Sequence, residues 1–383
     1  MTTRHVEPVR RGPRFAAAWW GEVVRVAPHG HAHWPALRVG ISVTAPLAIA
    51  VGVGHVGWAP YAVFGAIASA YGKQLDYGER LRAQVETGAA LTAAVVLGTA
   101  VGVIAPASWL AVLAMAAASV SGLLLTATRG WLPVPSLFLV FAVGTLSSYR
   151  HRASDLVLAL VLASAAAGLA VALGQVGRRL TTSRRPRSAA PPREQLRSVL
   201  RRPGARADAL VHAAAPLLAG LVAVAAHQGH PYWAAVTATV PLVGPSLASR
   251  VGRATLRTLG TLAGVLLAAV LIDHAGSPWV LVVDVAVLQV LTELFVARNY
   301  GIAVVAITPM ALILSHLGSP EPVGRLVSDR VIETVLGAVV AVVVVVAVHL
   351  RTTWGPTFSV RRSTRRVAPA ARTGGSAPGE PRP

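Results

Sequence analysis

Two carboxylates, Asp284 and Glu293, stand inside one apolar block of this 383-residue chain. The residues one helical turn from Asp284 are apolar, and the polar neighbour of Glu293 at that spacing is Gln289. An ionised carboxylate in such surroundings needs a partner from another segment, or it takes up a proton. Each carboxyl can therefore carry protons or serve as a neutral, hydrogen-bonded packing group. Gln289 and Thr292 make the neighbourhood of Glu293 the more polar one, which favours Glu293 as the proton carrier.

Arg253 and Arg257 lie one turn apart at the start of another apolar block. On a helix they share a face with Gly260 and Gly264. Two guanidinium groups on such a face can bind a carboxylate bidentately, and the glycines let a neighbouring helix approach closely. Arginines at the end of an apolar segment are equally typical of anchoring at the cytoplasmic surface of a membrane. Both interpretations stay open.

Two further motifs could contribute to a pathway for a ligand. The segment Arg298-Asn299-Tyr300 precedes an apolar block that Pro309 interrupts near its middle. A proline inside a helix frees a backbone carbonyl, which either lines a cavity or marks a simple bend. Arg330 and Glu333 are three residues apart at the start of the last apolar block, so they can pair with each other or face the pathway.

The sequence lacks the motifs of common soluble enzymes. Its only lysine, Lys73, is followed by Gln74, so there is no phosphate-binding P-loop. His29, His31 and His33 alternate without a neighbouring cysteine or carboxylate, which is a poor ligand set for a metal. We therefore expect no enzymatic activity, no cofactor and no metal.

Long apolar segments must position the charged residues discussed above. The chain is 54% hydrophobic and 13% charged, and its apolar residues form blocks of about the length that spans a bilayer, roughly 20 residues. This predicts an all-α, polytopic transmembrane protein with about 12 spans. The predicted spans are residues 36–55, 58–74, 84–104, 108–128, 131–148, 153–176, 208–227, 231–248, 257–273, 278–297, 299–317 and 328–350.

Basic residues concentrate outside the apolar blocks. They gather in the ranges 4–25, 178–206 and 351–382, and the net charge is +20. Under the positive-inside rule these segments are cytoplasmic, which an even number of spans allows for both termini. The positive charge is thus explained by the orientation of the chain in an inner or plasma membrane. We therefore expect lipid, and not nucleic acid, as the partner. Trp19 and Trp20 suggest an interfacial helix before the first span.

Short motifs recur between the two halves of the chain. Pro60-Tyr61 is echoed by Pro231-Tyr232 at an offset of 171 residues, and Ser154-Asp155 by Ser328-Asp329 at an offset of 174. Similar offsets predict two tandem six-helix repeats. The predicted units are an N-terminal segment 1–35, a first repeat 36–177, a basic linker 178–207, a second repeat 208–350 and a disordered basic tail 351–383.

The motifs of the second half resemble those of a known family. Their order runs from Pro231-Tyr232-Trp233 through Arg253, Arg257 and Arg298-Asn299-Tyr300 to Arg330-x-x-Glu333-Thr334-x-x-Gly337. It resembles the fusaric-acid-resistance-like family of integral membrane transporters, which includes bacterial aromatic acid exporters. The resemblance implies a secondary transporter that exports small organic, aromatic carboxylates.

Two rival functions stay open at this point. Plant malate channels are distantly similar to this family, which allows a passive anion channel. A non-transporting membrane scaffold is the other alternative. A transporter needs coupling carboxylates, a channel needs mainly arginines along a pore, and a scaffold needs neither. Assembly into a homo-oligomer is compatible with all three.

Overall fold

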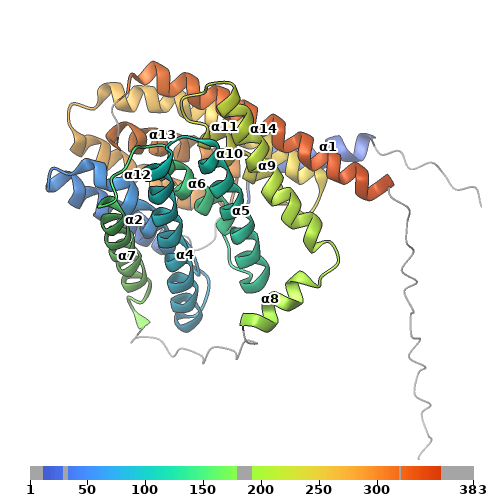
Figure 1. The fold of residues 1–383 in the computed structure, drawn as a ribbon, viewed down its shortest axis with the longest axis horizontal. Coiled ribbons are helices and arrows are strands. Elements are labelled where there is room, and N and C mark those ends of the chain that lie inside the picture. The colour runs from blue at the N-terminus through green and yellow to red at the C-terminus, as the bar shows by residue number, and fades with distance from the viewer. Residues whose placement is uncertain (1–11, 29–32, 179–191, 319–320, 355–383) are drawn as a thin grey trace, which may run out of the picture.

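The computed structural model describes residues 12–28, 33–178, 192–318 and 321–354. Within these residues all regular secondary structure is helical. Figure 1 shows the helices as one packed body, with α8 (Pro192–Leu200) at its edge. Residues 179–191 of the predicted linker and the predicted tail from residue 355 onward lie outside the described residues. The prediction of a disordered tail from residue 351 is wrong for residues 351–354, which continue helix α14, and the rest of the predicted linker includes helix α8. The predicted all-α class is confirmed.

The first half of the chain contains six helical segments in the order that the apolar blocks predict. The second is an α-helix continued by a short 3₁₀ helix, η2. These segments are α2 (His33–Gly52), α3 with η2 (Ala59–Ala70), α4 (Tyr77–Ile104), α5 (Trp109–Arg129), α6 (Pro135–Ser147) and α7 (Asp155–Gly174).

The second half repeats this order. Again a long first helix is followed by a short α-helix that continues into a 3₁₀ helix, and then by a helix of 28 residues. The segments are α9 (Ala205–Ala225), α10 with η4 (Tyr232–Leu242), α11 (Leu247–His274), α12 (Pro278–Phe295), α13 (Tyr300–Gly318) and α14 (Val323–Trp354).

Nine helices among the described residues are long and apolar enough to cross a membrane. The predicted spans 58–74, 131–148 and 231–248 correspond instead to short helices, so twelve full spans are not confirmed. Proline and glycine explain the shortening. Pro133 and Pro135 delay the start of α6, while Pro241 lies two residues before the extended residue Val243, which Gly244 follows.

The short helices α3 and α10 form the centre of the molecule. All eight residues of each are buried. α3 packs against α2 and α7, and α10 packs in the same way against α9 and α14. Because both helices end inside the structure and pass into extended backbone, they are interrupted segments of the kind that build binding sites in membrane proteins.

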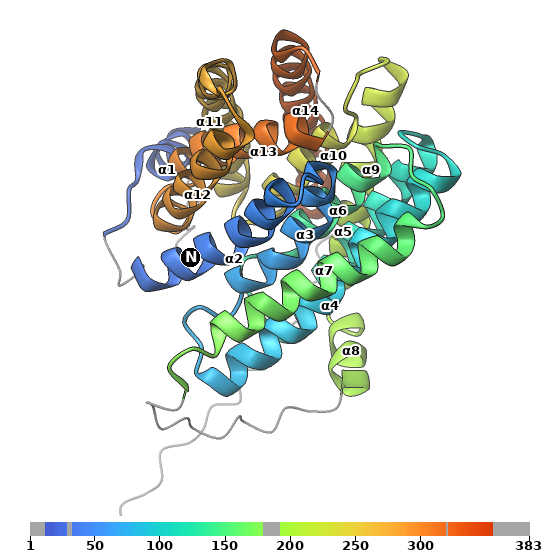
Figure 2. The ribbon, with the colours of Figure 1, turned by 90° about the vertical axis from the view of Figure 1, so that its left-hand side faces the viewer.

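The two halves meet through reciprocal helix pairs. The first helix of the first half, α2, packs against the fourth helix of the second half, α12. In the converse pair, α9 packs against α5. Figure 2 shows α2 beside α12, and the cyan and green helices of the first half below the orange ones of the second.

Glycines bring α11 against α13. A Cβ atom at Gly260 would lie 2.6 Å from the carbonyl oxygen of Gly301, and one at Gly264 would lie 2.7 Å from Cβ of Thr308. The predicted glycine face is therefore a packing face, as small residues in membrane helices usually are.

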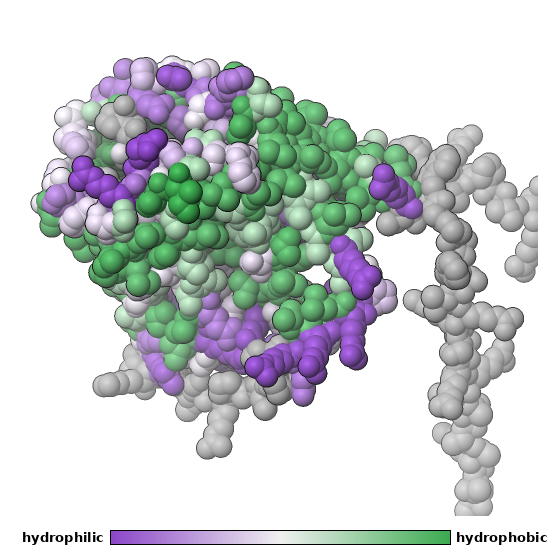
Figure 3. Space-filling model, in the orientation of Figure 1, coloured by the Kyte–Doolittle hydropathy of each residue, from purple (hydrophilic) through white to green (hydrophobic). Residues whose placement is uncertain are grey.

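The outer surface is strongly apolar. Leu266 is 71% exposed, Val157 is 66% exposed and Val343 is 61% exposed, all on helices long enough to span a bilayer. In Figure 3 hydrophobic residues cover most of the visible face, and hydrophilic residues gather along α8 and along the opposite edge. A surface of this kind is matched to lipid and not to water.

Helix α1 (Gly12–Val24) corresponds to the predicted interfacial helix. It packs along α11, and the indole Nε1 of Trp19 donates a hydrogen bond to Oγ1 of Thr255 over 3.2 Å. Trp20 is 60% exposed. Helix α1 is thus attached to the second half of the chain through Trp19, whereas Trp20 lies on the outer surface.

Candidate functional site

A cavity of about 860 Å³ lies between the two halves. Its walls include residues of α2, α3, α5 and α6 from the first half and of α10 to α13 from the second. This volume is within the range of small-molecule binding sites, roughly 300 to 1,000 Å³. The central short helices contribute to both walls, with Phe64 from α3 and Val236 from α10.

One end of the cavity carries charged side chains, and we call it the charged end. They come from the segment before α4, from the adjacent ends of α4, α5 and α12, and from the start of α11. With Arg257 one turn further in, the lining holds five basic and two acidic side chains, so its charge is net positive. The residues of the charged end are Lys73, Glu79, Arg82, Arg129, Arg253 and Glu293.

Aromatic and apolar side chains line the rest of the cavity. Phe64 and Phe141 meet edge to face with ring centroids 5.3 Å apart. Phe138 and Trp131 also line the wall, and all four of these rings come from the first half of the chain. A flat apolar molecule with a negative group at one end therefore matches the cavity in both shape and charge.

Lys73 and Glu293 pair across the boundary between the halves. Lys73 precedes α4, whereas Glu293 lies near the end of α12, and both line the cavity. Their side chains are 21% and 7% exposed. The second carboxylate oxygen of Glu293 lies 3.5 Å from Nε2 of Gln289. Glu293 thus has the partner from another segment that its apolar surroundings require.

Arg253, Arg257 and Tyr300 form the cationic wall of the cavity. The guanidinium carbon of Arg253 lies 5.7 Å from the centroid of the Tyr300 ring. Arg257 is only 2% exposed, and Nε of both arginines lacks a hydrogen-bond acceptor within the described residues. The hydroxyl of Tyr300 is also without a partner there. These unsatisfied donors are suited to a carboxylate ligand.

Arg330 lies behind this wall and not in it. It is 1% exposed, its guanidinium stacks 4.9 Å from the centroid of the Trp233 ring, and none of its nitrogens has an acceptor in the described part of the chain. Arg330 is close enough to Arg257 for the two positive charges to interact. It therefore adds positive potential to the site without touching the cavity.

Arg330 and Glu333 do not form the local ion pair that their spacing allowed. Glu333 accepts a hydrogen bond from the backbone N–H of His230 over 2.8 Å instead. Its side chain is fully buried. The guanidinium of Arg330 is instead directed at the Trp233 ring on which it stacks. The three-residue spacing on the helix was therefore not sufficient to form the predicted ion pair.

Three other predicted site residues lie outside the cavity lining. Asp284 is half-buried on α12. Arg298 donates from Nε to the carbonyl of Ala27, and Asn299 donates to the carbonyls of Val23 and Arg25, so this motif holds the chain after α1 in place. Pro309 packs against α11 near Gly264.

The family comparison covers part of the second half of the chain, including these arginines. Residues 218–344 match the family model of fusaric acid resistance protein-like sequences. This region, about a third of the chain, is similar to that family. It includes α10 to α13, and with them Arg253, Arg257, Glu293 and Tyr300.

A curated relative supports the assignment to membranes. The uncharacterized membrane protein YvaC of Bacillus subtilis (strain 168) is 27% identical over 123 residues, which are 32% of this chain. The match spans only about a fifth of the relative's own length. No solved structure matches the chain. Together with nine apolar helices, the family region identifies a multi-pass membrane protein.

Sequence reasoning did not find two parts of the site. Lys73 was noted only for the P-loop that it does not form, although a single lysine in a chain rich in arginine was a usable signal. The aromatic wall was also missed, because Phe64, Phe138 and Phe141 look like ordinary apolar residues of a span. Only the packing of helices shows that they face a shared cavity.

Proposed function

We propose that this protein is a secondary transporter that exports small aromatic carboxylates. The observation that carries the proposal is the cavity between the halves, which joins an aromatic wall to a cationic wall. An aromatic ring can pack against Phe64 and Phe141 while its carboxylate meets Arg253 and Arg257. Guanidinium groups bind carboxylates strongly when water is excluded.

We propose that the Lys73–Glu293 pair couples substrate binding to proton movement. A carboxylate that enters at the charged end can replace Glu293 as the partner of Lys73. Glu293 would then be left in a largely buried position without its cation, where protonation is favoured. The proton and the carboxylate would therefore cross together, and export would follow the outward gradient of the carboxylate. Because the pair joins the two halves, its opening also permits them to move relative to each other.

We further propose that residues 36–177 and 208–350 are two six-helix repeats. The equal order of helices and the reciprocal pairs α2 with α12 and α9 with α5 support this arrangement. With the basic linker on the side of the charged end, between α7 and α9, the cavity would open to the cytoplasm. Both chain termini would lie on that side as well.

Cysteine labelling tests the orientation, since the chain has no cysteine of its own. We expect Ser188→Cys and Ser376→Cys to resist a membrane-impermeant thiol reagent in intact cells and to react after the cells are opened. Both positions lie outside the described residues. Labelling of Ser188→Cys alone in intact cells would mean an odd number of spans in the second half and would refute the two-repeat arrangement.

The function is tested with purified protein in liposomes. We expect an imposed pH gradient to drive accumulation of labelled benzoate above equilibrium, with cyclohexanecarboxylate weaker and the cation benzylamine not transported. Protein-free liposomes give the passive leak. Because uncharged benzoic acid also crosses lipid along a pH gradient, uphill accumulation clearly above that of protein-free liposomes would establish a coupled transporter. Conductive flux that only follows the benzoate gradient would indicate a passive anion channel. The absence of any flux would favour the non-transporting scaffold.

A further inference from the structure

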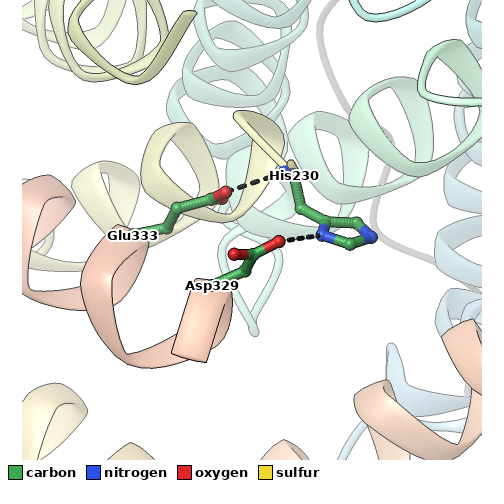
Figure 4. Close-up of side chains that lie close together, drawn as sticks. All are labelled: His230, Asp329 and Glu333. Carbon is green, nitrogen blue, oxygen red and sulfur yellow. Dashed lines mark hydrogen bonds and ion pairs between the residues drawn. The ribbon is translucent and has the colours of Figure 1, made fainter. Parts of the chain in front are cut away.

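A second cluster of ionisable side chains lies away from the cavity, where α13 has ended and α14 has begun. His230 stands just before α10, and Asp329 and Glu333 are one turn apart on α14. Nδ1 of His230 lies 3.2 Å from Oδ2 of Asp329. Figure 4 shows both carboxylates directed at His230, one at its ring and one at its backbone nitrogen. One ligand atom from each residue can be chosen so that all three are within 4.8 Å of one another.

The cluster is buried and its hydrogen bonding is incomplete. His230 is 6% exposed and Glu333 is fully buried, yet Oε2 of Glu333 accepts no hydrogen bond of normal geometry within the described residues. The backbone N–H of Ala234 is a further donor close to this carboxylate. A buried carboxylate oxygen without a donor is costly unless something else compensates it. The other oxygen of the same carboxylate, Oε1, accepts the hydrogen bond from the backbone N–H of His230. Glu333 is therefore held beside His230 while Oε2 stays available to a ligand.

The imidazole ring is fixed before any ligand arrives. It stacks on the Trp233 ring with centroids 4.4 Å apart and planes inclined by 16°. Gly229 leaves room for Asp329, because a Cβ atom at that position would collide with Oδ2 of Asp329. Rigid, buried ligands reduce the entropic cost of binding an ion.

A third carboxyl group lies beside the cluster. Glu321 brings Oε1 to 3.7 Å from Nε2 of His230. The guanidinium of Arg330 stacks on Trp233 and forms no hydrogen bond to these carboxyl groups. Three carboxyl groups therefore surround one imidazole, and a divalent cation could displace a proton from the cluster and take its place.

We propose that His230, Asp329 and Glu333 bind a divalent cation of the Zn²⁺ class. One imidazole and two carboxylates are ligands that Zn²⁺ accepts, with bonds of about 2.0 to 2.2 Å. Such bonds need ligand atoms about 3 to 4 Å apart, and the three ligand atoms lie within 4.8 Å of one another before any ion is bound. The bound ion would join the loop after α9 to the first turns of α14.

The first half of the chain offers a natural comparison. There His151 lies 3.8 Å from Asp155, the counterpart of Asp329 in the echoed Ser-Asp motif. At the position equivalent to Glu333 the first half has Ala159, 174 residues earlier. A histidine and one carboxylate remain, which is too few protein ligands for a tight Zn²⁺ site.

The test is to titrate Zn²⁺ into the full chain after purification in detergent and treatment with a chelator. Binding is measured by calorimetry and by the change in the midpoint of thermal unfolding. The parent for all variants carries serine at positions 29, 31 and 33, which removes adventitious binding by those histidines. We expect one Zn²⁺ per chain and a rise in the unfolding midpoint. Mg²⁺ and Ca²⁺ at the same concentration should not give this rise.

Matched variants decide between this site and others. Asp329→Asn and Glu333→Gln should each weaken Zn²⁺ binding by at least about 10-fold, the scale of losses at metal sites. Asp155→Asn should bind Zn²⁺ like the parent. The proposal fails if the parent binds no Zn²⁺, as expected of a proton site only, or if Asp329→Asn and Glu333→Gln bind it unchanged. Because binding is measured without transport, failure here is separate from failure of the transport proposal.

Discussion

Replacing both Arg253 and Arg257 with glutamine is expected to abolish high-affinity benzoate transport. Each arginine offers an unsatisfied guanidinium nitrogen beside the cavity, and a hydrogen bond to a charged group contributes about 1.5 to 3 kcal/mol. Loss of one such bond corresponds to roughly a 10- to 100-fold weaker apparent affinity. The double variant should therefore show at least the upper end of that range in concentration-dependent uptake into liposomes.

Two controls separate ligand binding from topology. Arg202→Gln removes the same charge from an exposed position in the linker region and should transport benzoate like the unmodified chain. Arg257→Lys retains the charge but loses the bidentate geometry, so an intermediate affinity is expected. The packing of Gly260 against α13 is untouched in all variants, so membrane insertion should be normal. Unchanged affinity in the double variant would assign the arginines to anchoring alone.

Glu293→Gln is expected to abolish pH-driven accumulation while leaving downhill benzoate exchange. Glutamine cannot exchange a proton, but it can still occupy the space next to Lys73. The measurement is uptake with and without a pH gradient, compared with exchange against internal unlabelled benzoate. Asp284→Asn is the matched control, since it changes a carboxyl on the same helix that does not line the cavity. Full uphill transport by Glu293→Gln would show that the carboxyl has a packing role.

Charge reversal tests the pair itself. Lys73→Glu places two carboxylates together at the boundary between the halves, so transport should fall by about 10-fold or more. Combining it with Glu293→Lys restores opposite charges and should recover exchange, although not the coupling to protons. A double variant that is no better than Lys73→Glu would mean that the two residues act independently.

Local sequence rules predicted the helices well, because each depends on residues close together in the chain. The end of α11 near residue 273 follows from apolar composition, and the close approach at Gly260 and Gly264 follows from small residues one turn apart. The start of α11 was not predicted, since the helix begins at Leu247, about ten residues before the predicted span 257–273. The same rules treated residues 231–248 as a span. They could not show that α10 would end early, in the middle of a packed core, and pass into extended backbone at Val243.

The site was only partly predictable, because it depends on contacts across the chain. Arg253, Arg257 and Glu293 were identified from charge in apolar surroundings, and all three line the cavity. The partner of Glu293 is 220 residues away in sequence, and no helical spacing points to Lys73. Arg298 shows the opposite error, since a charged residue at a span end proved to hold backbone from residue 27 in place.

The reciprocal pairs α2 with α12 and α9 with α5 give the contact between the halves a particular character. Each half offers its first helix to the fourth helix of the other, which is the isologous pattern of a two-fold dimer. Here a linker joins the two partners, so they are present at a fixed ratio and need not find each other in the lipid. The cavity between the halves is accordingly lined by residues of both partners of this covalent pair.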